Sequence, residues 1–279
     1  MFRVVVRFRA LIDTHCHLTF PDFAGKIDKT LADASEAGVD GVVTISTTVP
    51  DAAAALAVAK AHPRVWCSAG VHPLYSDKGT GPGGGHEWAG LGVVIADPKC
   101  VAWGELGLDN HYERPPRPLQ RQVLEEQLAF ILSARERGID KPIILHCREA
   151  FDDLIPVLRS TGIPGERFVF HCFTGTPADM RRVLDFGAMA SFTGVATYPN
   201  APEVREAFKL MPPDRYMIET DAPFLTPHAK RGSRPCVPGY ARLTAEALAS
   251  LLGEPWPRFH SRINQNTRRF FGVSSLVND

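Results

Sequence analysis

Residues 119–148 read LQRQVLEEQLAFILSARERGIDKPIILHCR and join an amphipathic helix to a short apolar run. In the segment Leu119–Arg137 the apolar residues fall on one stripe at helical spacing, with the charges opposite: Val123, Leu124, Leu128, Ile131 and Leu132. Gly138 stands where a helix ends, and Pro142–Cys147 has the length of a buried strand. The stretch predicts a helix that packs against a strand buried on both faces.

The same alternation of strand and helix recurs along the chain. Eight β-rich runs are spaced between helical patterns, at Ala10–Thr14, Asp40–Ser46, Val65–Gly70, Cys100–Gly104, Pro142–Cys147, Arg167–Cys172, Ala188–Phe192 and Arg215–Thr220. Helix boundaries are marked as well: Asp51 is placed to cap one helix, Thr176-Pro177 to open another, and Gly38, Gly138, Gly162 and Gly187 to end four. Eight alternations in 279 residues predict an α/β fold, a single-domain (β/α)8 TIM barrel over residues 1–279.

Two segments stand outside this pattern. In Met1–Arg9 apolar residues alternate with arginines, which suits an extra N-terminal strand or else an extension of the gene start. The Gly/Pro-rich stretch Lys78–His86 is expected to be an exposed loop after the third strand.

Composition limits the function. The formal net charge is +0, so any anionic substrate must be held by local charge. The six cysteines lack the regular spacing of a disulfide scaffold, and we expect reduced thiols in a cytoplasmic protein. No stretch approaches the roughly 18 apolar residues of a membrane span, so no membrane contact is expected.

Histidines and acids gather at the ends of the predicted strands. His15 and His17 are two residues apart at the end of the first strand, so their rings share a face. Four further residues hold equivalent positions at the ends of the fourth, fifth, sixth and eighth strands: Glu105, His146, His171 and Asp221. The C-terminal ends of barrel strands carry the active sites of this fold. The set predicts a centre for Zn²⁺, Mn²⁺ or similar ions, with a carboxylate able to bridge two of them.

Taken alone, each of these histidines could equally be a core residue or a surface residue with no metal to bind. The cysteines beside them, Cys16, Cys147 and Cys172, invite a thiolate ligand. Alternation along a strand points them away from the histidine side, so we expect buried, inert thiols.

Substrate contacts are expected on the same rim. His72 lies just after the third strand, and Arg148 follows His146. Three more basic residues occupy the loop after the eighth strand: Lys230, Arg231 and Arg234. Any one of them suits a solvated loop, but beside two cations the cluster fits phosphate binding.

At this point the motifs resemble the TatD family of metal-dependent deoxyribonucleases. The resemblance rests on DTHCHL from Asp13, GVHP from Gly70, GELGLD from Gly104, HCREA from His146, HCFTG from His171 and IETDAP from Ile218. It runs from about Leu11 to Gly272, and six ordered motifs are highly specific.

The resemblance implies a (β/α)8 metallohydrolase that cleaves phosphodiester bonds of DNA, often from a 3′ end. It implies that one divalent ion (Zn, Mn or Mg) lies among His15, His17, Glu105 and Asp221, and a second among Glu105, His146 and His171. A metal-activated hydroxide would attack phosphorus, Asp221 would take the proton, and His72 would contact phosphate or assist the leaving group. The partner would be DNA, as single strands or 3′ ends. The sequence leaves the oligomeric state open, and a monomer is compatible with it.

Two departures from the family pattern put substrate fit in doubt. Asn110-His111 stands where relatives commonly have an aromatic residue, and Arg231–Pro235 lacks the expected Arg-Asn-x-Pro. The same barrel could instead hydrolyse an ester, an amide or a D-aminoacyl-tRNA, or serve as a non-catalytic interaction module. Loss of a ligand would favour the last reading, and none is missing.

Overall fold

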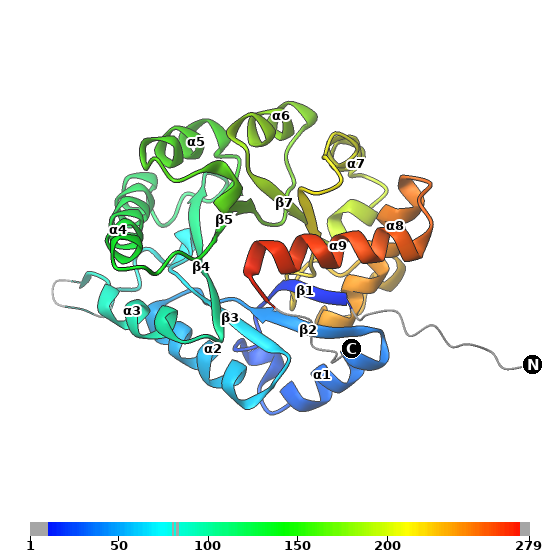
Figure 1. Ribbon diagram of the computed structural model, residues 1–279, viewed down its shortest axis with the longest axis horizontal. Helices are drawn as coiled ribbons and strands as arrows, with labels where there is room; N and C mark the ends of the chain where they lie inside the picture. The colour runs from blue at the N-terminus through cyan, green and yellow to red at the C-terminus, as the bar shows by residue number, and fades with distance from the viewer. Residues whose placement is uncertain (1–10, 80, 82–83, 274–279) are drawn as a thin grey trace, which may run out of the picture.

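Eight parallel strands form a ring inside a ring of helices in the computed structural model, which describes residues 11–79, 81 and 84–273 (Figure 1). The strands follow chain order, and each pairs with the next: β1 (Leu11–Cys16), β2 (Val39–Thr44), β3 (Val65–Ala69), β4 (Cys100–Asp109), β5 (Ile143–Arg148), β6 (Phe168–Phe170), β7 (Met189–Phe192) and β8 (Tyr216–Ile218). The predicted TIM barrel is confirmed.

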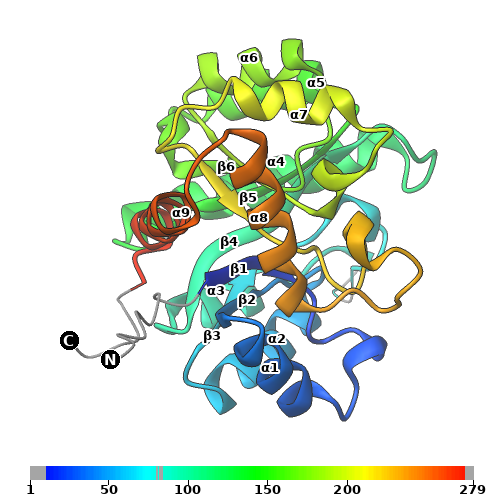
Figure 2. The same ribbon diagram turned by 90° about the vertical axis from the view of Figure 1, so that its right-hand side faces the viewer.

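The helices between the strands cover the outside of the barrel. They are α1 (Ile27–Glu36), α2 (Val49–Ala61), α3 (Trp88–Ala96), α4 (Arg117–Glu136), α5 (Phe151–Ser160), α6 (Pro177–Phe186), α7 (Pro202–Lys209) and α8 (Ala241–Leu251). The last helix, α9 (Trp256–Phe271), lies across one end of the barrel (Figures 1 and 2).

Two apolar clusters fill the interior of the barrel and the space between the barrel and its helices. The larger one joins the outer faces of the strands to the helices, as between Leu145 of β5 and Leu128 of α4. The smaller one gathers inward side chains such as Val43 and Ile144 with Phe270 and Phe271 from the end of α9. The barrel interior is thus filled and closed at the α9 end, and polar groups are left for the opposite end.

The barrel closes between β8 and β1 through the residues that follow β8. The Asp221 N–H donates to the His15 carbonyl (2.8 Å), and the His17 N–H donates to the Ala222 carbonyl (2.7 Å). The buried Asp13 carboxylate accepts from the Thr220 N–H (2.9 Å) and hydroxyl (2.6 Å). This seam brings candidate ligands from opposite ends of the sequence together.

Close backbone approach also shapes the site end of the barrel. A Cβ atom at Gly70 would lie 2.4 Å from the Gly104 Cα, a distance that no side chain tolerates. Only glycine at position 70 lets the backbone reach this close to the residue before Glu105.

Most predicted boundaries fall close to the observed ones. All four glycines expected to end helices have positive φ, and Thr176 caps α6 in a capping box with Asp179. Asp51 is not the cap of α2, because Thr48 accepts the Asp51 N–H and the helix begins at Val49. Strand β4 continues beyond the expected Gly104 to Asp109.

The structure tests the prediction for only one of the two segments outside the strand and helix pattern. The described part of Lys78–His86 holds no strand or α-helix, as expected for a loop. The prediction for Met1–Arg9 lies outside the described residues. No helix in the described ranges is long and apolar enough to span a membrane.

Candidate metal centre

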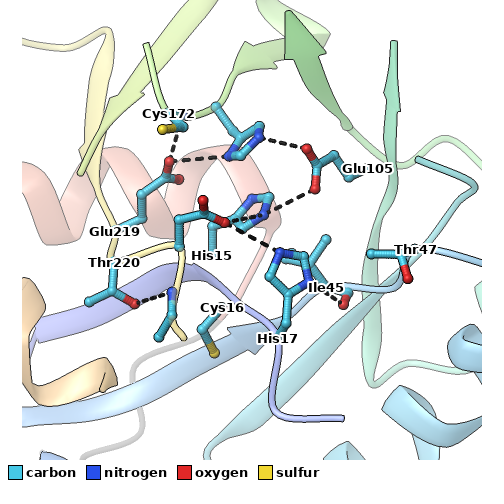
Figure 3. Close-up of polar contacts among 12 residues, drawn as sticks. His15, Cys16, His17, Ile45, Thr47, Glu105, Cys172, Glu219 and Thr220 are labelled. Carbon is cyan, nitrogen blue, oxygen red and sulfur yellow. Dashed lines mark hydrogen bonds and ion pairs between the residues drawn. The ribbon is translucent and has the colours of Figure 1, made fainter. Parts of the chain in front are cut away.

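All six predicted ligands fall into overlapping groups at the end of the barrel opposite α9. Figure 3 shows three of them, His15, His17 and Glu105, pointing toward one another. His15 lies in β1 and His17 follows it, Glu105 lies in β4, and His146 in β5. His171 and Asp221 stand just beyond the ends of β6 and β8. Three overlapping groups could each hold an ion: His15, His17 and Glu105; His15, His171 and Asp221; His72, Glu105 and His146.

Glu105 is the centre of the cluster, because its two oxygens face different histidines. Oε2 lies 3.2 Å from His15 Nε2, while Oε1 lies 2.6 Å from His171 Nε2 and 2.9 Å from His146 Nδ1. Burial favours the neutral acid, but the imidazoles around it hold the pKa of Glu105 well below its usual value. The ionised carboxylate is therefore placed to bridge two cations.

Asp221 lies between the two histidines of β1. Its Oδ1 is 3.3 Å from His17 Nε2 and 3.6 Å from His15 Nε2. Its backbone is left-handed, with φ of 58°, a conformation that costs a non-glycine residue energy and is found at functional sites. The seam hydrogen bond from its N–H to His15 holds it in this conformation.

Three histidines are oriented by oxygen acceptors behind them. His17 Nδ1 donates to the Ile45 carbonyl (3.1 Å), and His146 Nε2 donates to Asp109 Oδ2 (2.9 Å). His171 Nδ1 faces Glu219 Oε1 at 3.4 Å. A proton held on the outer nitrogen leaves the lone pair of the inner nitrogen free for a metal ion.

His72 has the opposite arrangement. Its Nδ1 accepts the Leu74 N–H (3.0 Å), so in the neutral ring the proton sits on Nε2. Burial lowers the pKa of His72 to about 3, which keeps the ring neutral. Nε2–H points into the cluster, 3.4 Å from Glu105 Oε1, and acts there as a hydrogen-bond donor rather than as a ligand.

The residues present fit divalent cations. His15 is fully buried and stacks on His171 at 3.8 Å, yet neither of its ring nitrogens makes a hydrogen bond. The ion pairs of Glu105, Asp109, Glu219 and Asp221 within the described residues are all with histidines. Buried negative charge with no Lys or Arg beside it and an unsatisfied imidazole both call for a metal ion.

The centre opens into a cavity of about 900 Å³. Arg148 lines this cavity, with its guanidinium 5.1 Å from the centre of the Tyr112 ring. Arg182 of α6 is a second guanidinium in the lining, and it pairs with Asp152 and Asp179. The structure does not bring Lys230, Arg231 and Arg234 into the lining, because these side chains stand exposed on the loop after β8.

The three cysteines next to the candidate histidines differ in whether strand alternation explains their positions. Cys16 and Cys147 belong to the apolar cluster between barrel and helices, as alternation predicts. For Cys172 the alternation argument does not apply, because it lies beyond β6 with φ of 46°, and its Sγ lies 3.6 Å from Thr193 Oγ1. None of the three joins a ligand group among the described residues.

Two acids behind the ligands were given no role from the sequence. Asp109 lies four residues after Glu105 in β4, and this even spacing in one strand could have placed it on the same face. Glu219 is buried and accepts from the Cys172 N–H and the Ser191 hydroxyl, both at 2.6 Å. A charged residue inside the buried run of β8 was the available signal for it.

Asp109→Asn is expected to weaken metal affinity about 10- to 100-fold. Asp109 Oδ1 accepts the His111 and Tyr112 N–H groups, so the amide oxygen of Asn would stay there and its NH₂ would face the His146 Nε2–H. Two opposed donors would force His146 into the wrong tautomer. Competition titration against a chelator measures the affinity, with Asp33→Asn, the same change at an exposed carboxylate of α1 that pairs with Lys29, as the control. Unchanged affinity would mean that Asp109 does not orient His146.

His72→Ala is expected to retain full metal content but to lower kcat by about 10²-fold, in the range of general acid–base or hydrogen-bond catalysis. The reason is that Nε2 of His72 carries a proton, whereas Nδ1 of His146, which accepts that proton's hydrogen bond at 3.1 Å, carries none and can turn its lone pair to a metal ion. His146→Ala is the matched variant and should lose metal. If His72→Ala lost an ion as readily as His146→Ala, His72 would be a ligand.

Comparison with known proteins agrees with the geometry. The family model of TatD-related DNases matches residues 12–272. The chain is 31% identical to the uncharacterised metal-dependent hydrolase YabD of Bacillus subtilis, over 95% of this chain and 100% of that one. It is 33% identical to the 3′-5′ ssDNA/RNA exonuclease TatD of Enterobacter lignolyticus, over 95% and 100% of the two chains.

A solved structure matches as well. The TatD homologue YjjV of Escherichia coli K12 superposes with a TM-score of 0.86 at 30% identity and covers 96% of this chain and 100% of its own. Three observations agree: the family model matches nearly the whole chain, the relatives match over their full length, and the predicted metal ligands lie together in the structure. The chain therefore belongs to the TatD-related DNase family of metal-dependent hydrolases.

Proposed function

We propose that this hydrolase cleaves phosphodiester bonds of single-stranded DNA, one nucleotide at a time from the 3′ end. The observation that carries the proposal is the cluster of imidazoles and carboxylates that opens into a cavity lined by Arg148 and Arg182. Guanidinium groups bind phosphate with directed hydrogen bonds, and a substrate with no anionic group would make no use of their charge. The names of relatives such as the Enterobacter exonuclease support the same substrate class.

Two divalent ions would occupy the centre in this proposal. His15, His17, Glu105 and Asp221 would hold one, and Glu105, His146 and His171 the other, with Glu105 shared. When bound, such ions lower the pKa of water and neutralise charge that gathers on a phosphoryl group. Zn²⁺ and Mn²⁺ suit this mixture of imidazole and carboxylate better than Mg²⁺, which prefers oxygen ligands.

The residues of the chain would divide the remaining work. Nearby imidazoles keep the pKa of Asp221 below its usual value against the effect of burial, so its carboxylate is ionised and can accept a proton from the attacking water. The Nε2–H of His72 would donate to a phosphate or leaving-group oxygen. Arg148 would hold a neighbouring phosphate, and Lys230, Arg231 and Arg234 would meet the strand further out.

The cavity favours an end of a strand. It is enclosed by loops that follow several β-strands of one barrel. The free end of a DNA strand can enter such a cavity directly, whereas an internal site of a duplex would first have to bend or melt.

The six cysteines are all free thiols, which supports a cytoplasmic protein. One barrel supplies all six candidate ligands, so the centre needs no residue from a second copy of the chain.

Metal-loaded protein incubated with 5′-labelled linear and with circular single-stranded DNA tests the proposal. A ladder that shortens from the 3′ end, with circles intact, is the expected result. Rapid cutting of circles would replace the exonuclease with an endonuclease. Parallel reactions with RNA, a carboxylic ester and a D-aminoacyl-tRNA test the other substrates, and preferred hydrolysis of one of the last two would overturn the nuclease.

A further inference from the structure

Two phenylalanines extend the metal centre into the cavity as a short aromatic ladder. Phe20 stacks on the ring of His17, with centroids 4.7 Å apart and ring planes 22° apart. Phe224 packs edge to face on Phe20 at 6.0 Å and lies 6.4 Å from His17. The ladder therefore begins at a candidate ligand and ends at Phe224.

Equivalent turns hold the two rings in place. The Phe20 N–H donates to the His17 carbonyl (3.1 Å), and the Phe224 N–H donates to the Asp221 carbonyl (2.9 Å). Each phenylalanine thus follows a candidate ligand by three residues, on neighbouring sides of the β1–β8 seam. The rings are fixed relative to the metal centre by the backbone that positions the ligands themselves.

Phe224 leaves apolar surface open in the cavity. Its exposed fraction is 47%, and it lines the cavity together with Phe20. Among the described residues, Tyr112 is another exposed large aromatic side chain in this lining, but the Arg148 guanidinium already lies over its ring at 5.1 Å, whereas Val93, Leu210 and Leu252 lie outside the lining. An exposed aromatic ring held rigidly beside a polar centre marks a surface for a flat apolar group.

We infer that Phe224, supported by Phe20, is the stacking platform for the base of the 3′-terminal nucleotide. This inference rests on the proposed function and adds a base contact to it. Every base has a flat π-face, so stacking on an aromatic ring holds single strands with little regard to sequence. The two phenylalanine rings carry no charge, so the platform would bind the base while the cations and arginines bind phosphate.

The test is a cycle of one protein change and one substrate change. Phe224→Ala and the wild-type holoenzyme are compared on two single-stranded oligonucleotides, one with a 3′-terminal thymidine and one with a 3′-terminal abasic deoxyribose. Phe224→Ala should lower kcat/KM about 10-fold on the thymidine end and leave the rate on the abasic end unchanged. Phe224→Trp should restore the thymidine rate, and Leu252→Ala, at an exposed apolar residue outside the cavity, should match the wild type on both.

The outcomes separate this inference from the proposed function. An equal loss on both ends, or no loss on either, would overturn the stacking platform while the nuclease stands. A wild-type holoenzyme that cleaves neither oligonucleotide would overturn the nuclease. Metal content of each variant is measured alongside, and if Phe224→Ala fails to fold, Phe224→Leu keeps the apolar bulk without the flat ring and should show the same selective loss.

Discussion

Glu105→Ala is expected to lose both metal ions and to lower kcat/KM at least about 10³-fold, the scale of removing the electrostatic stabilisation of a reaction centre. The two oxygens of Glu105 face different histidines, His15 on one side and His171 and His146 on the other. No other side chain in the described ranges could replace it at both places. Elemental analysis of the purified variant and rates on single-stranded DNA measure the two effects.

The conservative change Glu105→Gln separates charge from shape. The amide keeps the size of the side chain but offers one oxygen in place of two, so we expect one ion to remain at reduced affinity. Glu125→Ala removes an exposed carboxylate of α4 that pairs only with Arg121 in the described structure, and it should behave as the wild type. Two ions retained by Glu105→Ala would place the bridging group elsewhere.

The barrel and the ligand set were accessible from sequence because each follows from periodicity. An apolar run such as Ile143–Leu145 can only be a strand buried on both faces, and His146 directly after it must stand at a strand end. Parallel strands in a closed barrel bring such ends together. The sequence therefore predicts that these residues lie close to one another, although it gives no distances between them.

The remaining features depend on contacts that the periodicity of the sequence does not encode. The tautomer of His72 is set by the Leu74 N–H, and the direction of His146 by Asp109, and neither follows from strand spacing. Strand β6 ends at Phe170 and the chain turns left-handed at Cys172, so alternation fails there. Loops after strands have no period, so the exposed position of Arg231 could not be predicted. The entry of Arg182 into the cavity could not be predicted either, because it depends on how the loop before α6 places that helix.

Exhaustive chelation is expected to abolish hydrolysis, with a loss of at least about 10³-fold. The residues at the centre are imidazoles and ionised carboxylates, and among the described residues no Ser or Lys side chain lines the cavity to act as a nucleophile. Burial raises the pKa of the nearest thiol, that of Cys172, well above its usual value, so this thiol is protonated at neutral pH and a poor nucleophile.

The same treatment should destabilise the fold, and this gives a readout that is independent of activity. Ions that bind only the folded chain stabilise it by about 2.7 kcal/mol for each site at 100 times Kd, so the apo-protein should melt roughly 5 °C or more below the metal-loaded protein. Without the ions, the buried carboxylates of Glu105 and Asp221 keep only histidines as partners, and His15 keeps two ring nitrogens without a hydrogen bond. Calorimetry of apo and reconstituted protein, with metal content confirmed by elemental analysis, measures the difference. Full activity and an unchanged melting temperature in metal-free protein would show that this cluster is held together by its own charges and that hydrolysis does not depend on a metal ion.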